Sequence, residues 1–477
     1  MAMKRAVCFL SAVLLAFGLT ACNNIQSGSA GTETGEKIKT DSGIEIPEIN
    51  LGENNTIQIV STGNPRYNTK DGLIAKYFEK YYGGEISLKQ VSTNELGTML
   101  ASSVSAGTPP HLIEMNGGFP SYTISNLIAP VDDVGVNYGE KQFDDLKFIY
   151  DSYTYDGKHY VLPWSSLAYQ KIFYNVKIFE DNELETPKEL FDQGAWTYDT
   201  FYDTVKALYL DEDRNGTPER YGLAVAGYHA GALAYGGGEQ LIKIDGKKLV
   251  NNVSGNAFST GFNLLKKMII TDKLVPQNFG EDYVADLFAS GNAAMVLGPF
   301  FWCQQADLFS NMRASRSLEW VVLPKATANG EHYVYGKTGA YYMPTGVKKA
   351  DYPLIKAFMY TSLVELYSEG VEGTDIYQAG QDEWLGNFTD YGYTKDDYKA
   401  YRELNSRNDC IVVMEPLDSI VFADAFFNQM ISDNKSFEQA VAILSPEIDA
   451  ELQYLVEDAQ DVAITTGAGT DSGKTEK

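Results

Sequence analysis

Residues 211–219, Asp-Glu-Asp-Arg-Asn-Gly-Thr-Pro-Glu, place oxygen-bearing side chains at a spacing that could hold a calcium ion. Side-chain oxygens stand at the first, third and fifth positions, a glycine that can make a sharp turn at the sixth, and a carboxylate at the ninth, and hard oxygen ligands suit Ca²⁺. The bidentate glutamate expected at the twelfth position is replaced by Gly222. A structural Ca²⁺ is therefore predicted, with an ordinary polar turn before the strand at 221–223 as the alternative. The predicted ligands are Asp211, Asp213, Asn215, Thr217 and Glu219.

The other reactive residue types are few and scattered. The chain has four cysteines and four histidines, with no HExxH or other metal-ligand spacing. Cys303 and Cys410 could pair outside the cell, and a buried thiol at Cys303 is the alternative. No G-x-S-x-G or similar catalytic signature occurs. We therefore expect no cofactor apart from the Ca²⁺, and no enzymatic activity.

Length and charge narrow the class of partner. The 477 residues suggest two or three domains. Lys and Arg total 38 against 64 Asp and Glu, giving a formal net charge of -26. Such an acidic surface repels nucleic-acid phosphates and anionic lipid headgroups. A nucleic-acid partner is thus not expected.

The N-terminus has the pattern of an export signal. Two basic residues precede an apolar run at 6–19, which is shorter than the roughly 20 residues that span a membrane. The run ends in Leu19-Thr20-Ala21-Cys22, which resembles the bacterial lipobox, whose cysteine carries the lipid anchor. An ordinary secretory signal with a chance cysteine is the alternative. We predict a signal peptide at 1–21, an anchor at Cys22 holding the protein to the extracytoplasmic face of the cell membrane, and a flexible tether at 22–54.

The elements that must position any site begin after this segment. Alternating patterns predict strands at 56–60, 85–91 and 111–115, with helices at 71–82 and 96–106 between them. Strands and helices that alternate at this length indicate an α/β protein with a largely parallel sheet. Ligands of such sheets bind at the carboxyl ends of the strands.

Several motifs resemble those of one family. They are Asp156-Gly157-Lys158-His159-Tyr160-Val161-Leu162-Pro163, Tyr174-Asn175, Thr186-Pro187 with Trp196-Thr197-Tyr198-Asp199-Thr200-Phe201, the run from Phe288 to Trp302, and Leu323-Pro324 followed by Gly336-Lys337-Thr338-Gly339. In this order, over about residues 55–455, they resemble the family 1 extracellular solute-binding proteins, the maltose-binding-protein-like group.

The resemblance implies a two-lobed periplasmic-binding-protein fold of the class II type, with mostly parallel sheets flanked by helices and a cleft between the lobes. The chain would cross between lobes more than once. Lobe 1 is expected at 55–162 plus about 336–378, and lobe 2 at 163–335 plus about 379–460. A disordered tail is expected at 461–477, where Gly, Ser and Thr are frequent.

The resemblance and the composition together suggest which residues meet a ligand. Tyr, Phe and Trp make up 13% of the chain, and pyranose rings pack on such flat faces while their hydroxyls bind planar polar groups. Each type of residue also has an alternative role that involves no ligand. The aromatic residues could pack in the core, the asparagines could form turns, and the cations could lie on the solvated surface. The glycine triplet at 236–238 could be a plain flexible loop. The predicted ligand-binding residues are Asn64, Arg66, Asn116, Trp164, Ser165, Tyr235, Phe300, Trp302, Lys337, Thr338 and Trp384.

The function implied is capture of a sugar or oligosaccharide by a monomeric lipoprotein that delivers it to the permease of an ABC importer. The calcium loop also resembles a shorter Ca²⁺ loop of some oligosaccharide-binding relatives. Two alternatives stay open at this point. A surface glycan hydrolase needs two positioned carboxylates, which an acidic chain can supply. A binding protein for a peptide or another solute would use the same aromatic and amide side chains.

Overall fold

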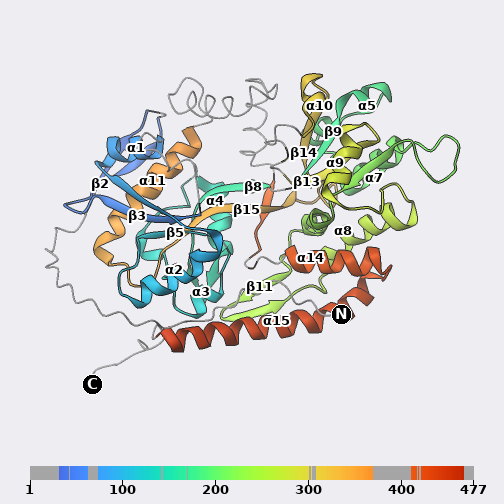
Figure 1. The fold of residues 1–477 in the computed structure, drawn as a ribbon. Coiled ribbons are helices and arrows are strands. Elements are labelled where there is room, and N and C mark those ends of the chain that lie inside the picture. Colours follow the sequence, from blue (N-terminus) through green and yellow to red (C-terminus); the bar gives the residue numbers. More distant parts are fainter. Residues whose placement is uncertain are drawn as a thin grey trace.

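The computed structural model describes residues 32–41, 43–62, 73–115, 117–140, 143–168, 170–299, 302, 308–368, 410–415, 417 and 420–466. These residues form two α/β lobes side by side, joined by strands that run from one to the other (Figure 1). The prediction of a two-lobed α/β fold is confirmed. Within the described residues no helix is both long and apolar enough to cross a membrane.

Lobe 1 is built on a sheet in the order β16-β15-β5-β3-β4, in which β16 is the short strand Ile411–Val413. Three of its strands run parallel, as β3 (Thr56–Ser61) lies between β4 (Glu85–Gln90) and β5 (Leu112–Glu114). Helices α1 (Leu73–Tyr82), α2 (Thr93–Ser105) and α11 (Tyr352–Ser368) cover it. The core of this lobe draws on residues 46–162, 340–363 and 414.

Lobe 2 has a four-stranded sheet in the order β10-β13-β9-β14. Only β10 (Tyr221–Val225) and β13 (Ala293–Pro299) pair in parallel, because β9 (Gln170–Asn175) runs antiparallel to both of its neighbours, β13 and β14 (Leu318–Val322). The sheet is thus more mixed than predicted. The chain enters β9 directly from a strand that leads out of lobe 1. No helix lies between these two strands. The core draws on residues 172–335 and 413–452.

Two crossings between the lobes lie side by side. Strand β8 (Leu162–Ala168) leads out of lobe 1 into β9, and β15 (Tyr333–Tyr342) returns from lobe 2. They pair antiparallel from Gly336 with Ala168 to Tyr341 with Leu162. We refer to this pair, β8 and β15, as the crossing ribbon. A long helix, α15 (Phe437–Thr466), lies beneath both lobes and contacts α3 (Ser121–Ile124) of lobe 1 (Figure 1).

The predicted tether is wrong for residues 32–54. Strands β1 (Thr32–Lys39) and β2 (Glu45–Asn50) form an antiparallel hairpin there. Ile46, Ile49 and Leu51 are 0%, 4% and 5% exposed and join the lobe 1 core, where β2 contacts α11. These few apolar residues order a segment whose average composition is polar. The signal peptide, Cys22 and residues 22–31 lie outside the described residues.

The predicted disordered tail also begins too early. Helix α15 continues to Thr466, so residues 461–466 are helical rather than disordered. The apolar residues Val462, Ala463 and Ile464 distinguish this stretch from the Gly-, Ser- and Thr-rich sequence that follows it. Residues 467–477 lie outside the described part of the chain.

Candidate ligand-binding site

The crossing ribbon brings together predicted site residues from two distant parts of the chain. Ser165 lies opposite Gly339, and Thr338 lies opposite Ser166, next to Lys337. For Ser165 and Lys337 only the backbone position is described. Thr338 is half-buried and its hydroxyl donates to the Gly339 carbonyl at 3.1 Å. The ribbon therefore forms a polar link between the two sheets.

Trp164 precedes Ser165 on β8 and is half-buried. Its ring centroid lies 6.4 Å from that of Tyr341, which is part of the lobe 1 core. The indole thus has one side against the core and a partly exposed remainder. Its predicted role as a stacking surface stays a prediction.

At the lobe 1 end of the ribbon, polar groups gather where β3 and β5 end. Glu114, the last residue of β5, accepts hydrogen bonds through Oε2 from the Ser61 hydroxyl at 2.6 Å and from the Thr62 amide and hydroxyl at 2.8 and 3.1 Å. Tyr341 of the ribbon pairs with Glu114. We call Ser61, Thr62 and Glu114 the lobe 1 edge. Asn64, Arg66 and Asn116, predicted from the same strand ends, lie outside the described residues.

At the lobe 2 end, a second polar group follows the ends of β10 and β13. Gln170, the first residue of β9, pairs with Pro299, the last residue of β13. His229 lies in the 3-10 helix η3 (Gly227–Gly237) after β10, and Glu281 begins helix α9 (Glu281–Ala289). We call Gln170, His229 and Glu281 the lobe 2 edge.

The lobe 2 edge is deeply buried. Gln170 and His229 are 2% and 1% exposed. The amide Nε2 of Gln170 lies 3.4 Å from His229 Nδ1, and His229 Nε2 lies 3.4 Å from Glu281 Oε1. The distance between His229 Nε2 and Glu281 Oε1 is within ion-pair range, but the two groups are not aligned as a hydrogen bond. These residues were not predicted from the sequence because they come from three separate elements and share no local motif.

Two of the predicted aromatic contacts are wrong. Tyr235 is 0% exposed, with its ring 4.9 Å from that of Tyr335 and 6.1 Å from that of Phe258. Trp302 is 3% exposed and packs on Phe173 and Phe309 with ring centroids 6.1 and 5.9 Å away. Both rings are enclosed by apolar side chains of lobe 2 and present no face to a ligand.

The glycine triplet has a packing role as well. A Cβ on Gly236 would lie 2.0 Å from the Tyr198 hydroxyl, and one on Gly237 would lie 2.6 Å from the Ala257 Cβ. These glycines therefore allow helices and η3 to approach closely inside lobe 2, rather than serving a ligand. Phe300, Trp384 and Cys303 lie outside the described residues, so their predicted roles stay predictions.

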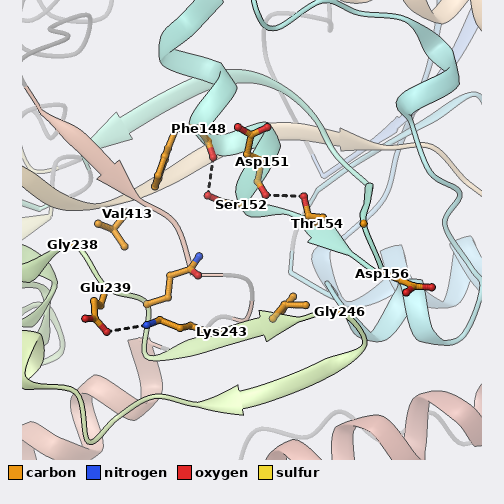
Figure 2. A pocket seen from close by; sticks show the side chains of 13 residues that line it. Phe148, Asp151, Ser152, Thr154, Asp156, Gly238, Glu239, Lys243, Gly246 and Val413 are labelled. Carbon is orange, nitrogen blue, oxygen red and sulfur yellow. Dashed lines mark hydrogen bonds and ion pairs between the residues drawn. The ribbon is translucent and has the colours of Figure 1, made fainter.

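A cavity of about 460 Å³ also lies between the lobes, and none of the residues of the two edges lines it (Figure 2). Helix α4 (Asp144–Ser152) and the turn at Asp156 line it from lobe 1, and β11 (Ile242–Asp245) lines it from lobe 2. The Asp156 amide donates to the Gly246 carbonyl at 2.9 Å, so the lobes touch here.

The charged groups of this cavity already have partners. Asp151 pairs with Lys147, Asp156 with Lys247 at 3.1 Å, and Glu239 with Lys243 at 2.9 Å. Hydrogen bonds from Asn252 and Lys243 lower the pKa of the Glu239 carboxyl. We place the candidate ligand site at the two edges and the crossing ribbon instead, because they lie at strand ends next to the strands that link the lobes, where ligands of α/β sheets bind.

The loop at 211–219 folds its oxygens onto its own backbone. Asp211 accepts from the Gly216 amide at 3.2 Å, Asp213 from the Asn215 amide at 3.0 Å, and Asn215 from the Thr217 amide at 2.7 Å. Glu219 accepts from the Glu212 amide at 3.1 Å. Among the described residues no three His, Cys, Asp or Glu side chains converge as a metal site. The Ca²⁺ site therefore stays a prediction.

Comparison with known proteins decides the family. The sequence profile of the bacterial extracellular solute-binding proteins matches residues 62–359, which is more than half of the chain. The chain belongs to this family. The family prediction is thus confirmed, and the family is one of binding proteins outside the cell.

One relative of this solute-binding protein is the diacetylchitobiose-binding protein DasA of Streptomyces coelicolor, 25% identical over 324 residues, or 67% of this chain and 71% of the relative. Among solved structures, the sugar-binding protein MalE of Xanthomonas citri superposes with a TM-score of 0.58 at 13% identity, covering 88% of this chain and 100% of that one. A cyclo/maltodextrin-binding protein complexed with maltotetraose gives 0.54 at 17% identity, covering 88% and 98%. These structures share the two-lobed fold.

Proposed function

We propose that this solute-binding protein captures a sugar or oligosaccharide between its lobes and delivers it to the permease of an ABC importer. The observation that supports this most is that the crossing ribbon adjoins a polar edge in each lobe. Carboxylate and amide oxygens at strand ends are suited to accept hydrogen bonds from hydroxyls. The names of DasA and MalE point to the same class of cargo.

The proposal includes how cargo is held. Each lobe contributes one edge, and rotation about the crossing ribbon would close the edges over the ligand. The half-buried Trp164 and Thr338 would lie beneath it, with Ser165 and Lys337 beside them on the ribbon. Asn64, Arg66, Asn116, Phe300 and Trp384 remain proposed contacts from the segments that adjoin the site in sequence.

The remaining sequence predictions complete the proposal. We infer that residues 1–21 are removed, that Cys22 carries the lipid anchor, and that the protein acts as a monomer on the extracytoplasmic face of the membrane. The loop at 211–219 would bind Ca²⁺ to fix the connection between α7 (Tyr198–Leu208) and β10. No catalytic step is proposed.

The test is thermal unfolding of the purified protein with a panel of sugars, including maltose, maltotetraose and N,N′-diacetylchitobiose, and with a mixture of short peptides. A ligand at 100 times its Kd adds about 2.7 kcal/mol to the unfolding free energy, which raises Tm by several degrees. We expect one class of saccharide to raise Tm and the peptides to leave it unchanged. A shift with peptides alone, or release of chromophore from aryl glycosides, would contradict the proposal.

A further inference from the structure

The lobe 2 edge contains an amide whose hydrogen-bonding capacity is only half used. Gln170 is 2% exposed, and its Nε2 faces His229 Nδ1 at 3.4 Å. Within the described part of the chain, Gln170 Oε1 is buried without a hydrogen-bond partner. A buried carbonyl oxygen left without a donor costs about 1–3 kcal/mol, so such groups are uncommon unless a ligand or water supplies the donor.

Glu281 determines which atom of Gln170 stays available. Its carboxylate lies 3.4 Å from His229 Nε2 and favours the tautomer that carries the proton on Nε2. In this neutral tautomer His229 Nδ1 is an acceptor, which matches the amide nitrogen of Gln170 that faces it at 3.4 Å. The remaining group of Gln170, the Oε1 atom, can only accept a hydrogen bond.

Backbone contacts hold this arrangement at the edge of the sheet. The Gly227 amide at the start of η3 donates to the Phe279 carbonyl just before α9 at 2.9 Å, and the His229 amide donates to the Ala226 carbonyl at 2.9 Å. Gln170 is fixed by its pairing with Pro299 and stands two residues after the end of β8 in the crossing ribbon. The three side chains therefore come from independent elements that meet where cargo would touch lobe 2.

We propose that Gln170 binds a hydroxyl donor of the cargo, and that His229 and Glu281 are positioning residues that orient the Gln170 amide. This inference rests on the proposed sugar-binding function and adds a selection rule to it. A sugar with a free hydroxyl at the matching position is bound, whereas one in which that hydroxyl is replaced by fluorine, which cannot donate, is bound less well.

The experiment is isothermal titration of the saccharide that raises Tm most, alongside its monofluoro derivatives with each hydroxyl replaced in turn. For the unaltered protein we expect one derivative to bind about tenfold more weakly than the parent, the loss that one hydrogen bond explains. The parent sugar should bind to the Gln170→Leu variant about tenfold more weakly than to the unaltered protein. The derivative that the unaltered protein binds weakly should bind to the variant no more weakly than to the unaltered protein. Equal weakening for the parent and every derivative would overturn the proposal.

A second variant keeps the test valid if Gln170→Leu does not fold. Glu281 is 35% exposed, so Glu281→Ala should fold, and it should reduce the discrimination between parent and derivative while Glu281→Gln largely retains it. The matched control is Asp282→Ala, which removes the same charge from the next, exposed residue of α9. Unchanged discrimination in Glu281→Ala would overturn the positioning role.

The outcomes separate this inference from the function it rests on. If no saccharide raises the Tm of the unaltered protein, the proposed function fails and the selection rule fails with it. If a saccharide binds and all variants discriminate as the unaltered protein does, sugar capture stands and only the role of Gln170, His229 and Glu281 is wrong.

Discussion

The two edges that meet the crossing ribbon differ in how their carboxylates are held. In lobe 1, Glu114 Oε2 accepts three hydrogen bonds from Ser61 and Thr62, so this edge is complete within the protein. In lobe 2, Glu281 has a single contact with His229, and Gln170 Oε1 has no partner among the described residues. The carboxylate of the lobe 1 edge is therefore held by hydrogen bonds within its own lobe, whereas the lobe 2 edge contains a buried acceptor that the described residues leave unsatisfied.

The largest expected effect concerns the core behind the lobe 2 edge. Trp302→Ala should lower the unfolding free energy by about 3–5 kcal/mol, because it leaves a large cavity between Phe173 and Phe309. Phe148→Ala is the control, since that ring is 41% exposed and should cost far less. Chemical denaturation measures both. Full stability of Trp302→Ala combined with lost sugar binding would show that Trp302 belongs to the ligand site.

Calcium should act on stability and leave both edges unaffected. Ca²⁺ at 100 times its Kd should add about 2.7 kcal/mol to the unfolding free energy, and Asp213→Asn should remove most of that gain. Asp203→Asn, an exposed change on the preceding helix α7, is the control and should respond as the unaltered protein does. Thermal unfolding with Ca²⁺ and with a chelator gives the answer. An equal Tm in both conditions would rule out the site.

Removing the two carboxylates tests the comparison directly. Glu114→Ala removes the acceptor of three hydrogen bonds from Ser61 and Thr62 and should cost about 2 kcal/mol of unfolding free energy. Glu281→Ala should cost less than about 0.5 kcal/mol, since its side chain is partly exposed and makes one contact. Denaturant titration compares the two variants. Equal losses, or a greater loss for Glu281→Ala, would contradict the distinction between a complete and an open edge.

A smaller effect should appear as a pH dependence of lobe 1. His111 Nδ1 accepts from the Gln58 amide at 2.9 Å, and burial lowers the pKa of this histidine, with Asp351 opposing the shift. A histidine with a depressed folded-state pKa stabilises the fold above its unfolded pKa of about 6.5, and that contribution is lost as the pH falls through the folded-state value.

We therefore expect stability to decline below about pH 6.5, and His111→Gln to remove about 1 kcal/mol or less of that decline. Denaturation at pH 7.5, 6.5 and 5.5 measures it, with His159→Gln, at the half-buried last residue of β7 (Lys158–His159), as the control. A decline of the same size in His111→Gln would assign the pH dependence to other groups.

The fold was predictable because the signals that define it are local. The strands and helices expected between residues 56 and 115 are found close to their predicted bounds, since alternation and helical spacing within ten residues determine them. The hairpin at 32–50 was missed for the opposite reason. Its ordering depends on Ile46 and Ile49 packing against α11, more than 300 residues away in the chain.

The site was only partly predictable. A motif locates a residue near a cleft but does not fix which way its side chain points, and Trp302 therefore turned out to pack on Phe173 in the core. The lobe 2 edge joins residues 170, 229 and 281, which are about 50 to 60 positions apart, so no local pattern contains it. Contacts of this kind become visible only when the sheet order is known.

The most direct test of the central claim is a crystal structure of the protein with the saccharide that raises its Tm. We expect the sugar to lie on the crossing ribbon between the two edges, with one hydroxyl in hydrogen-bonding distance of Gln170 Oε1, at roughly 2.7–3.0 Å. A sugar in the cavity between α4 and β11, or on the outer surface of one lobe, would contradict the central claim.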